Sequence, residues 1–261
     1  PNAKIISVNN DKEELNLELR KIDHKINLEL EDFFSKILKK KLNEKQYNYL
    51  EWNKKCHKIK IQNEIPNIFK KTNPIDLYKF MYELGSLSKR NSILITDAGS
   101  NYYIGGQVWK FENKQTEISS TTNAAMGLSV PLSIGAAIAN KKKQILSVTG
   151  DGSIELNLQE LKTISHYNLN IITFVINNGG YVSMKKWQDN FFSGNRLDTE
   201  VKTGAGTLNF RKIANAFDLS YLKISKVEEI RKKLNYCFNL KKPLLVEVIT
   251  DKNQKIFGKE F

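Results

Sequence analysis

The stretch that decides the fold is QILSVTGDGS at residues 144–153, followed 23 residues later by NNGG at residues 177–180. Each polar cluster follows an apolar run, QILSVT (144–149) or NIITFVI (170–176), that predicts a buried β-strand. Between them, residues 155–167 carry leucine and isoleucine at helical spacing. A strand, a helix and a strand in this order close right-handed into a parallel sheet. The sequence therefore predicts an α/β fold with both clusters at the carboxyl ends of parallel strands, where such sheets bind ligands.

The residue types in the two clusters suit a metal ion that carries a phosphate group. Asp151 and Asn178 are hard oxygen ligands of the kind that Mg²⁺ prefers, and Mg²⁺ usually completes its shell with water and substrate phosphates. The glycines allow the backbone to approach a ligand closely. Gly152 and Ser153 would begin a helix, whose N-terminal N–H groups favour phosphate. The competing interpretation is a pair of unrelated Asp-Gly and Asn-Gly turns.

The spacing of Gly-Asp-Gly and Asn-Asn resembles the two-part signature of the thiamine-diphosphate enzymes. The resemblance implies a three-layer α/β/α domain with a central, mainly parallel sheet, and thiamine diphosphate and Mg²⁺ as cofactors. It also implies that the Asp151 and Asn178 side chains and the Gly180 carbonyl are the metal ligands. In the same region, the cofactor-binding residues that it implies are Gly150, Asp151, Gly152, Ser153, Asn178, Gly180, Tyr181 and Val182.

Residues 123–138 resemble the family segment that holds the cofactor in a bent conformation. Met126 falls where the family places an apolar wedge between the two rings, and Ala124 where a backbone carbonyl meets the aminopyrimidine. A Met that merely fills the core is the alternative. The end of this segment is rich in small residues and predicts a helix that lies close against the sheet. These residues are Gly135, Ala136, Ala137 and Ala139.

A further apolar strand is predicted at residues 92–97, and the polar residues that follow it are candidate phosphate contacts. In the family this strand end contributes to the diphosphate site, which points to Gly99, Ser100 and Asn101. An ordinary strand-to-loop turn explains the same residues equally well.

Residues 181–192, YVSMKKWQDNFF, resemble the corresponding segment of acetolactate synthases. Trp187 falls where those synthases place a Trp at the substrate entrance, although an aromatic that packs on a helix is an equal alternative. The polar, glycine-containing residues 193–206 depart from the family pattern. Because this loop would determine the acceptor, the resemblance leaves the substrate open.

The function that the resemblance implies is decarboxylation of a 2-oxo acid such as pyruvate and ligation of the resulting carbanion to a second carbonyl. A 2-oxo acid decarboxylase and a carboligase that acts on a nucleotide-linked sugar remain alternatives. Two alternatives of another class are a non-catalytic cofactor-binding subunit and a polyanion-binding protein.

The resemblance divides the chain into a tail of the family's middle domain (1–40), a helical linker (41–73) and the diphosphate- and Mg²⁺-binding domain (74–261). The family's pyrimidine-binding domain, which supplies the activating Glu, does not fit into the first 70 residues. We therefore expect a truncated fragment or one part of a two-subunit enzyme, inactive alone. We also expect a homodimer or homotetramer, or a complex with a separate pyrimidine-domain subunit. FAD binding by the full-length protein stays open.

Composition sets weaker bounds on function. The net charge is +13, but the lysines occur in short dispersed runs without interleaved aromatics, so we expect a solvated surface and no specific nucleic acid. No stretch reaches the ~18 apolar residues of a membrane span, and no charged-apolar-small signal sequence opens the chain. Cys56 and Cys237 are far apart and lack metal spacing. We expect a cytoplasmic protein with free thiols.

Overall fold

A computed structural model describes residues 3–17, 21–39, 49–62, 73–112, 114–120 and 123–257. The chain forms two compact units, Pro1–Asn63 and Glu64–Phe261. The division falls inside the segment expected to be a linker, and the finer boundaries at residues 40 and 73 stay a prediction. None of the helices in the described ranges combines the length and apolar character that crossing a membrane requires.

The first unit is a small α/β assembly. Strands β1 (Ile6–Asn9) and β2 (His24–Asn27) pair in parallel, and helix α1 (Lys12–Asn16) connects them. The Asp11 side chain accepts the backbone N–H groups of Glu13 and Glu14 and so caps α1. Helices α2 (Leu30–Lys39) and α3 (Leu50–Gln62) follow. Strand β2 was not predicted, since HKIN lacks an apolar run.

The second unit is built on a six-stranded parallel sheet in the order β4-β3-β5-β6-β8-β7. The strands are β3 (Ile93–Thr96), β4 (Thr116–Ser119), β5 (Ile145–Gly150), β6 (Ile171–Asn177), β7 (Ser220–Ile224) and β8 (Leu244–Ile249). The central strands are nearly continuous apolar runs, as expected for a parallel sheet covered on both faces.

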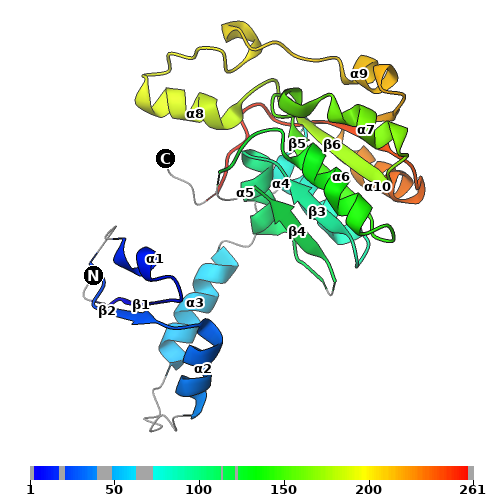
Figure 1. The fold of residues 1–261 in the computed structure, drawn as a ribbon. Coiled ribbons are helices and arrows are strands. Elements are labelled where there is room, and N and C mark those ends of the chain that lie inside the picture. The colour runs from blue at the N-terminus through cyan, green and yellow to red at the C-terminus, as the bar shows by residue number, and fades with distance from the viewer. Residues whose placement is uncertain are drawn as a thin grey trace. The chain divides into compact units, whose positions relative to one another are not determined.

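Helices cover both faces of this sheet (Figure 1). One face packs against α4 (Leu77–Leu87), α5 (Ser100–Val108) and α10 (Ile230–Asn239). The other packs against α6 (Ser129–Ala139), α7 (Glu160–His166) and α9 (Phe210–Ala216). Two apolar cores result, one on each side of the sheet. This arrangement confirms the predicted three-layer α/β/α fold.

Two local expectations need correction. Residues 155–167 do not form one helix, because a short 3-10 helix η2 (Ile154–Asn157) precedes α7. In α6, Ala136 and Ala137 are buried against the sheet, but Gly135 and Ala139 are exposed. Gly135 and Ala139 are four residues apart and share one helix face, which is exposed, so the four small residues do not all face the sheet.

The elements not yet described come after β6 and before β8 in the sequence. They are α8 (Val182–Phe191), the 3-10 helix η3 (Val201–Thr203) and the 3-10 helix η4 (Val227–Glu229).

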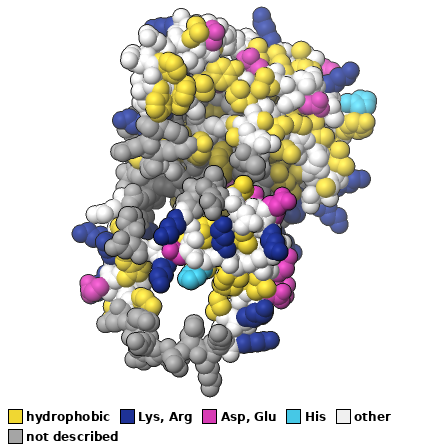
Figure 2. Space-filling view, turned by 60° about the vertical axis from the view of Figure 1, so that its left-hand side comes forward, with side chains coloured by type: hydrophobic (Ala, Val, Ile, Leu, Met, Phe, Trp, Pro, Cys, Tyr) yellow, Lys and Arg dark blue, Asp and Glu magenta, His cyan; other side chains and the backbone are white. Residues whose placement is uncertain are grey.

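On the face drawn in Figure 2, basic side chains are dispersed among acidic and hydrophobic ones.

Strand register brings the polar clusters together at one edge of the sheet. Thr96 at the end of β3 pairs with Val148 of β5, and Gly150 at the end of β5 pairs with Ile176 of β6. The residues that follow these strand ends, Asp97, Asp151 and Asn178, therefore emerge at the same carboxyl edge.

Candidate functional site

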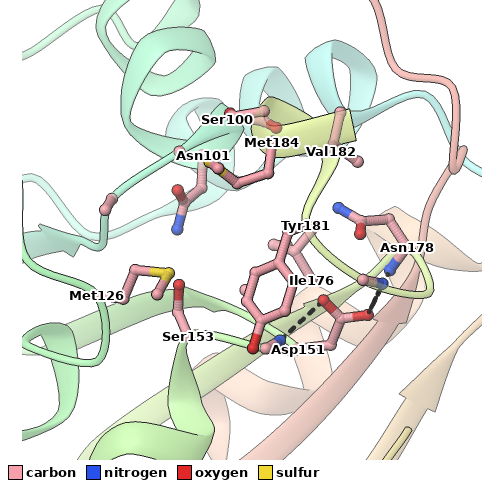
Figure 3. Close-up of a pocket in the computed structure, with 16 residues that line it drawn as sticks. Ser100, Asn101, Met126, Asp151, Ser153, Ile176, Asn178, Tyr181, Val182 and Met184 are labelled. Atoms are coloured by element: carbon pink, nitrogen blue, oxygen red, sulfur yellow. Dashed lines mark hydrogen bonds between the residues drawn. The ribbon is translucent and has the colours of Figure 1, made fainter. Parts of the chain in front are cut away.

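A cavity of about 160 Å³ opens where β3, β5 and β6 end. Figure 3 shows Met126 at one end of it, Asp151 and Asn178 at the other, and the Tyr181 ring between them. Residues that the sequence pointed to and that line it are Gly99, Ser100, Asn101, Met126, Gly150, Asp151, Gly152, Ser153, Asn178, Gly180, Tyr181 and Val182. Residues that sequence reasoning did not single out are Ala98, Ile176, Ser183 and Met184.

Two of the predicted site residues do not line this cavity. Ala124 is exposed and has a φ of 46°, a left-handed conformation that favours glycine. Trp187 lies on α8, one turn beyond the cavity-lining Met184, and 44% of its surface is exposed. Its ring centroid is 5.3 Å from that of Phe191 and 5.2 Å from that of Phe192.

Backbone N–H groups hold the Asp151 carboxylate in place. Its Oδ2 accepts N–H groups of Asn178 (3.2 Å), Gly179 (2.8 Å) and Gly180 (3.0 Å), and its Oδ1 accepts only that of Gly152 (3.0 Å). Two of these bonds are dashed in Figure 3. Burial raises the pKa of Asp151, and the four N–H groups oppose this shift. A carboxylate oxygen has two lone-pair directions, so Oδ1 can still accept a cation.

The Asn178 side chain supplies a second oxygen beside Asp151. Its Oδ1 is buried and has no hydrogen-bond partner among the residues that the structure describes, an arrangement that is unfavourable unless a ligand completes it. No group of three or more His, Cys, Asp and Glu side chains capable of holding a metal occurs within the described ranges. A carboxylate and an amide oxygen, with space for phosphate and water, fit Mg²⁺ better than a metal bound entirely by protein ligands.

Two helix N-termini supply N–H donors to the same cavity. Ser100 and Asn101 begin α5, and Val182, Ser183 and Met184 begin α8. Neither helix has a side-chain cap hydrogen bond at its start. First-turn N–H groups without such a cap form a site for an anion, which the helix dipoles also favour.

The Asn101 side chain itself serves to hold α5 against the sheet. Its Nδ2 donates to the Val148 carbonyl at 2.9 Å, and its Oδ1 accepts the Tyr102 N–H at 3.0 Å. The Asn101 side chain therefore joins the start of α5 to β5, and the backbone N–H groups of that turn are the better candidate phosphate contacts.

Glycine is required where the site is tightest. A Cβ on Gly152 would lie 2.4 Å from the Tyr181 ring. Gly180 has a φ of 128°, and a Cβ there would lie 2.3 Å from the Thr199 carbonyl oxygen. These contacts let the Gly150–Ser153 turn lie directly beneath Tyr181, so the two clusters of the motif form one surface.

The loop between α8 and α9 is fixed to α8 by an ion network. Arg196 donates from Nε and Nη2 to the two Asp189 carboxylate oxygens, each at 2.8 Å, and from Nη1 to Glu200 at 3.2 Å. Gly180 also forms an isolated antiparallel bridge with Glu200. The loop for which the sequence showed no family pattern is thus anchored beside the candidate metal ligand.

The sequence family described as "Thiamine pyrophosphate enzyme, C-terminal TPP binding domain" matches residues 97–248, which contain every element of the cavity. The chain belongs to the thiamine pyrophosphate enzymes. Thiamine pyrophosphate is another name for thiamine diphosphate, and membership confirms the family that the two-part motif indicated.

Several relatives of this thiamine pyrophosphate enzyme are acetolactate synthases. The chain is 31% identical over 219 residues to the acetolactate synthase large subunit of Buchnera aphidicola subsp. Acyrthosiphon pisum, covering 84% of this chain and 34% of that protein. It is 27% identical over 258 residues to the acetolactate synthase isozyme 1 large subunit of Escherichia coli K12, covering 98% and 44%. It is 26% identical over 225 residues to acetolactate synthase 1, chloroplastic, of Zea mays, covering 84% and 35%. The chain thus spans well under half the length of these relatives.

Proposed function

We propose that this chain binds the diphosphate of thiamine diphosphate through a Mg²⁺ ion held by Asp151, Asn178 and the Gly180 carbonyl. We further propose that it serves an acetolactate synthase-like enzyme that decarboxylates a 2-oxo acid such as pyruvate and ligates the product to a second carbonyl. The observation that carries the proposal is the buried Asn178 Oδ1 without a partner beside the Asp151 carboxylate.

The charge balance supports a metal at this end of the cavity. Burial raises the pKa of Glu155, and the nearby Asp151 charge raises it further. Asp151 lines the cavity and Glu155 does not, so the Asp151 carboxylate is the negative charge that a divalent cation would meet there. A diphosphate would then be bound by the metal on one side and by the N-termini of α5 and α8 on the other.

The opposite end of the cavity suits the organic part of the cofactor. Met126 lines it, and its flexible thioether can pack against an aromatic ring. Bound thiamine diphosphate supplies the carbanion-stabilising chemistry, and the protein supplies binding and orientation. The residues of this chain would hold the diphosphate and support the rings.

The relatives favour a ligase over a simple decarboxylase, because those compared above are all described as acetolactate synthases. We propose pyruvate as donor, Trp187 as a candidate substrate contact, and a homo-oligomer or a complex with a pyrimidine-domain subunit as the working assembly. FAD binding by the full-length protein stays a prediction that no residue described here supports.

The test is to supply the full-length gene product with thiamine diphosphate, Mg²⁺ and ¹³C-labelled pyruvate and to follow products by NMR. A two-pyruvate ligation product would support the synthase assignment. Labelled acetaldehyde alone would indicate a decarboxylase. Pyruvate consumption only when a nucleotide-linked keto sugar is added would assign that acceptor. No consumption under any of these conditions would contradict catalysis on pyruvate.

A further inference from the structure

Asp97 is a buried carboxylate at the end of β3 that the motif does not include. It is 3% exposed, and both of its oxygens accept hydrogen bonds. The Gly127 N–H lies 3.0 Å from each oxygen. Oδ2 also accepts the hydroxyls of Thr149 (2.7 Å) and Ser129 (3.2 Å), and Oδ1 accepts the Ala98 N–H (2.8 Å). One side chain therefore joins β3, β5 and the loop before α6.

No ion pair to Asp97 occurs in the part of the chain that the structure describes. Burial accordingly raises the pKa of Asp97, and the hydrogen bonds from Thr149, Ala98, Ser129 and Gly127 oppose the shift. A buried carboxylate without a cation is unfavourable unless hydrogen bonds satisfy it fully. Because Asp97 lies where β3, β5 and the loop before α6 meet, these hydrogen bonds hold the three segments together.

Gly127, the main partner of Asp97, is held from three sides. Its N–H donates to Asp97, and its carbonyl accepts the Asn157 Nδ2 at 3.1 Å. Its φ is 81°, and a Cβ there would lie 2.8 Å from the Ser153 carbonyl oxygen. Gly127 is thus pressed against the Gly150–Ser153 turn. The next residue toward the N-terminus, Met126, lines the cavity.

We propose that Asp97 is a positioning residue that fixes Met126 relative to the Gly150–Ser153 turn and so shapes the end of the cavity that takes the rings of the cofactor. This role rests on the proposed function. It differs from metal binding, because Asp97 does not line the cavity and acts through Gly127. The two ends of the site should therefore respond separately to substitution.

Asp97→Asn tests this with little change in shape. The amide nitrogen would replace one of the two oxygens that lie 3.0 Å from the Gly127 N–H and would oppose that donor, whereas the Ser129 and Thr149 hydroxyls can rotate and accept. Calorimetric titrations of the full-length gene product would compare thiamine diphosphate with inorganic diphosphate, both with Mg²⁺. We expect thiamine diphosphate to bind at least about tenfold more weakly and inorganic diphosphate to bind within about twofold of wild type.

Two further variants separate positioning from folding. Asn157→Asp removes the donor to the Gly127 carbonyl from a partly exposed side chain, and should weaken thiamine diphosphate selectively as well. Asp76→Asn is the matched control, because Asp76 is a buried Asp that caps α4 and Asn caps equally well. It should leave both ligands unaffected.

Equal losses for both ligands in Asp97→Asn, or none, would overturn the positioning role. If that variant does not fold, Asn157→Asp decides: a selective loss supports the role, and unchanged binding overturns it. Wild-type protein that binds neither ligand would instead remove the proposed function, and this role with it.

Discussion

Asp97 and Asp151 occupy equivalent places at the ends of the neighbouring parallel strands β3 and β5, yet their surroundings differ. Both are buried, and burial raises the pKa of both. Asp97 accepts hydrogen bonds on both oxygens, two of them from hydroxyls that can rotate to meet it. Within the described part of the chain, Asp151 accepts only backbone N–H groups and has just one on Oδ1.

The difference shows how two similar carboxylates can serve different purposes. Partners on both oxygens of Asp97 leave little capacity for a ligand, so this side chain can only organise the protein. The rigid backbone donors around Asp151 fix its orientation and leave capacity on Oδ1 beside the partnerless Asn178 Oδ1. We therefore propose protein positioning for the first carboxylate and metal binding for the second.

Of the variants that test this difference, Asp151→Asn should have the largest effect, a loss of metal affinity. It removes the charge of a proposed metal ligand, so the affinity for Mn²⁺, used as a paramagnetic substitute for Mg²⁺, should fall at least about 100-fold. Electron paramagnetic resonance titration in the presence of inorganic diphosphate measures it. Asp97→Asn is the comparison and should retain the Mn²⁺ affinity within about threefold. Similar losses in both variants would erase the distinction between the two carboxylates.

Gly152→Ala tests the close packing at the Asp151 end. The added methyl would displace the Tyr181 ring, and we expect thiamine diphosphate affinity to fall about tenfold, roughly 1.4 kcal/mol. In a Tyr181→Ala background, where the obstructing ring is absent, adding Gly152→Ala should reduce the affinity for thiamine diphosphate by less than it does in the wild type. Calorimetry on all four proteins completes the cycle. Strictly additive losses would show that the ring contact is not the cause.

The pH dependence of stability should carry a contribution from each carboxyl. A carboxyl whose pKa is higher in the folded chain than its ordinary value of 3.8 binds more protons when folded. The free energy of unfolding then decreases as pH rises from that ordinary value through the raised folded pKa. The stability of wild type relative to Asp97→Asn should therefore decline across this window, and likewise relative to Asp151→Asn.

Bound metal and cofactor should distinguish the contributions of Asp97 and Asp151 to the pH dependence of stability. A bound cation favours the ionised form of Asp151, so saturating Mg²⁺ and thiamine diphosphate should abolish its decline and leave that of Asp97. Urea unfolding at a series of pH values provides the free energies. A decline at Asp151 that persists with ligand would argue against direct contact between this carboxylate and the metal.

Trp187→Ala should have the smallest effect on cofactor binding. The side chain is partly exposed and packs on Phe191 and Phe192, so we expect a stability loss of about 1.5 kcal/mol. Thiamine diphosphate affinity should stay within about twofold, because Trp187 does not line the cavity. A raised KM for the 2-oxo acid would support the substrate contact. Weakened cofactor binding would indicate that Trp187 supports the cofactor rather than the substrate.

The central strands of the sheet and the cavity-lining residues at their ends could be predicted because they follow local patterns. Apolar runs that end in Gly-Asp-Gly and Asn-Asn identify strand ends, and parallel topology brings those ends to one edge. Each ligand candidate is adjacent in sequence to its strand, so no long-range contact had to be inferred.

The support around Asp97 could not be predicted, because its partners come from distant segments. Gly127, Ser129 and Thr149 are 30, 32 and 52 residues away along the chain. The same limit hid the approach of Tyr181 to Gly152 and of Thr199 to Gly180. Trp187 was associated with the substrate entrance by sequence position alone, and only the helix shows that it lies one turn beyond the cavity.

Calorimetric titration of the wild-type full-length gene product with thiamine diphosphate, first with Mg²⁺ and then with EDTA, tests the central claim most directly. The arrangement of Asp151 and Asn178 predicts binding with Mg²⁺ that is lost when EDTA removes the metal. Equally tight binding in EDTA would contradict the assignment of these two side chains as the anchors of the diphosphate.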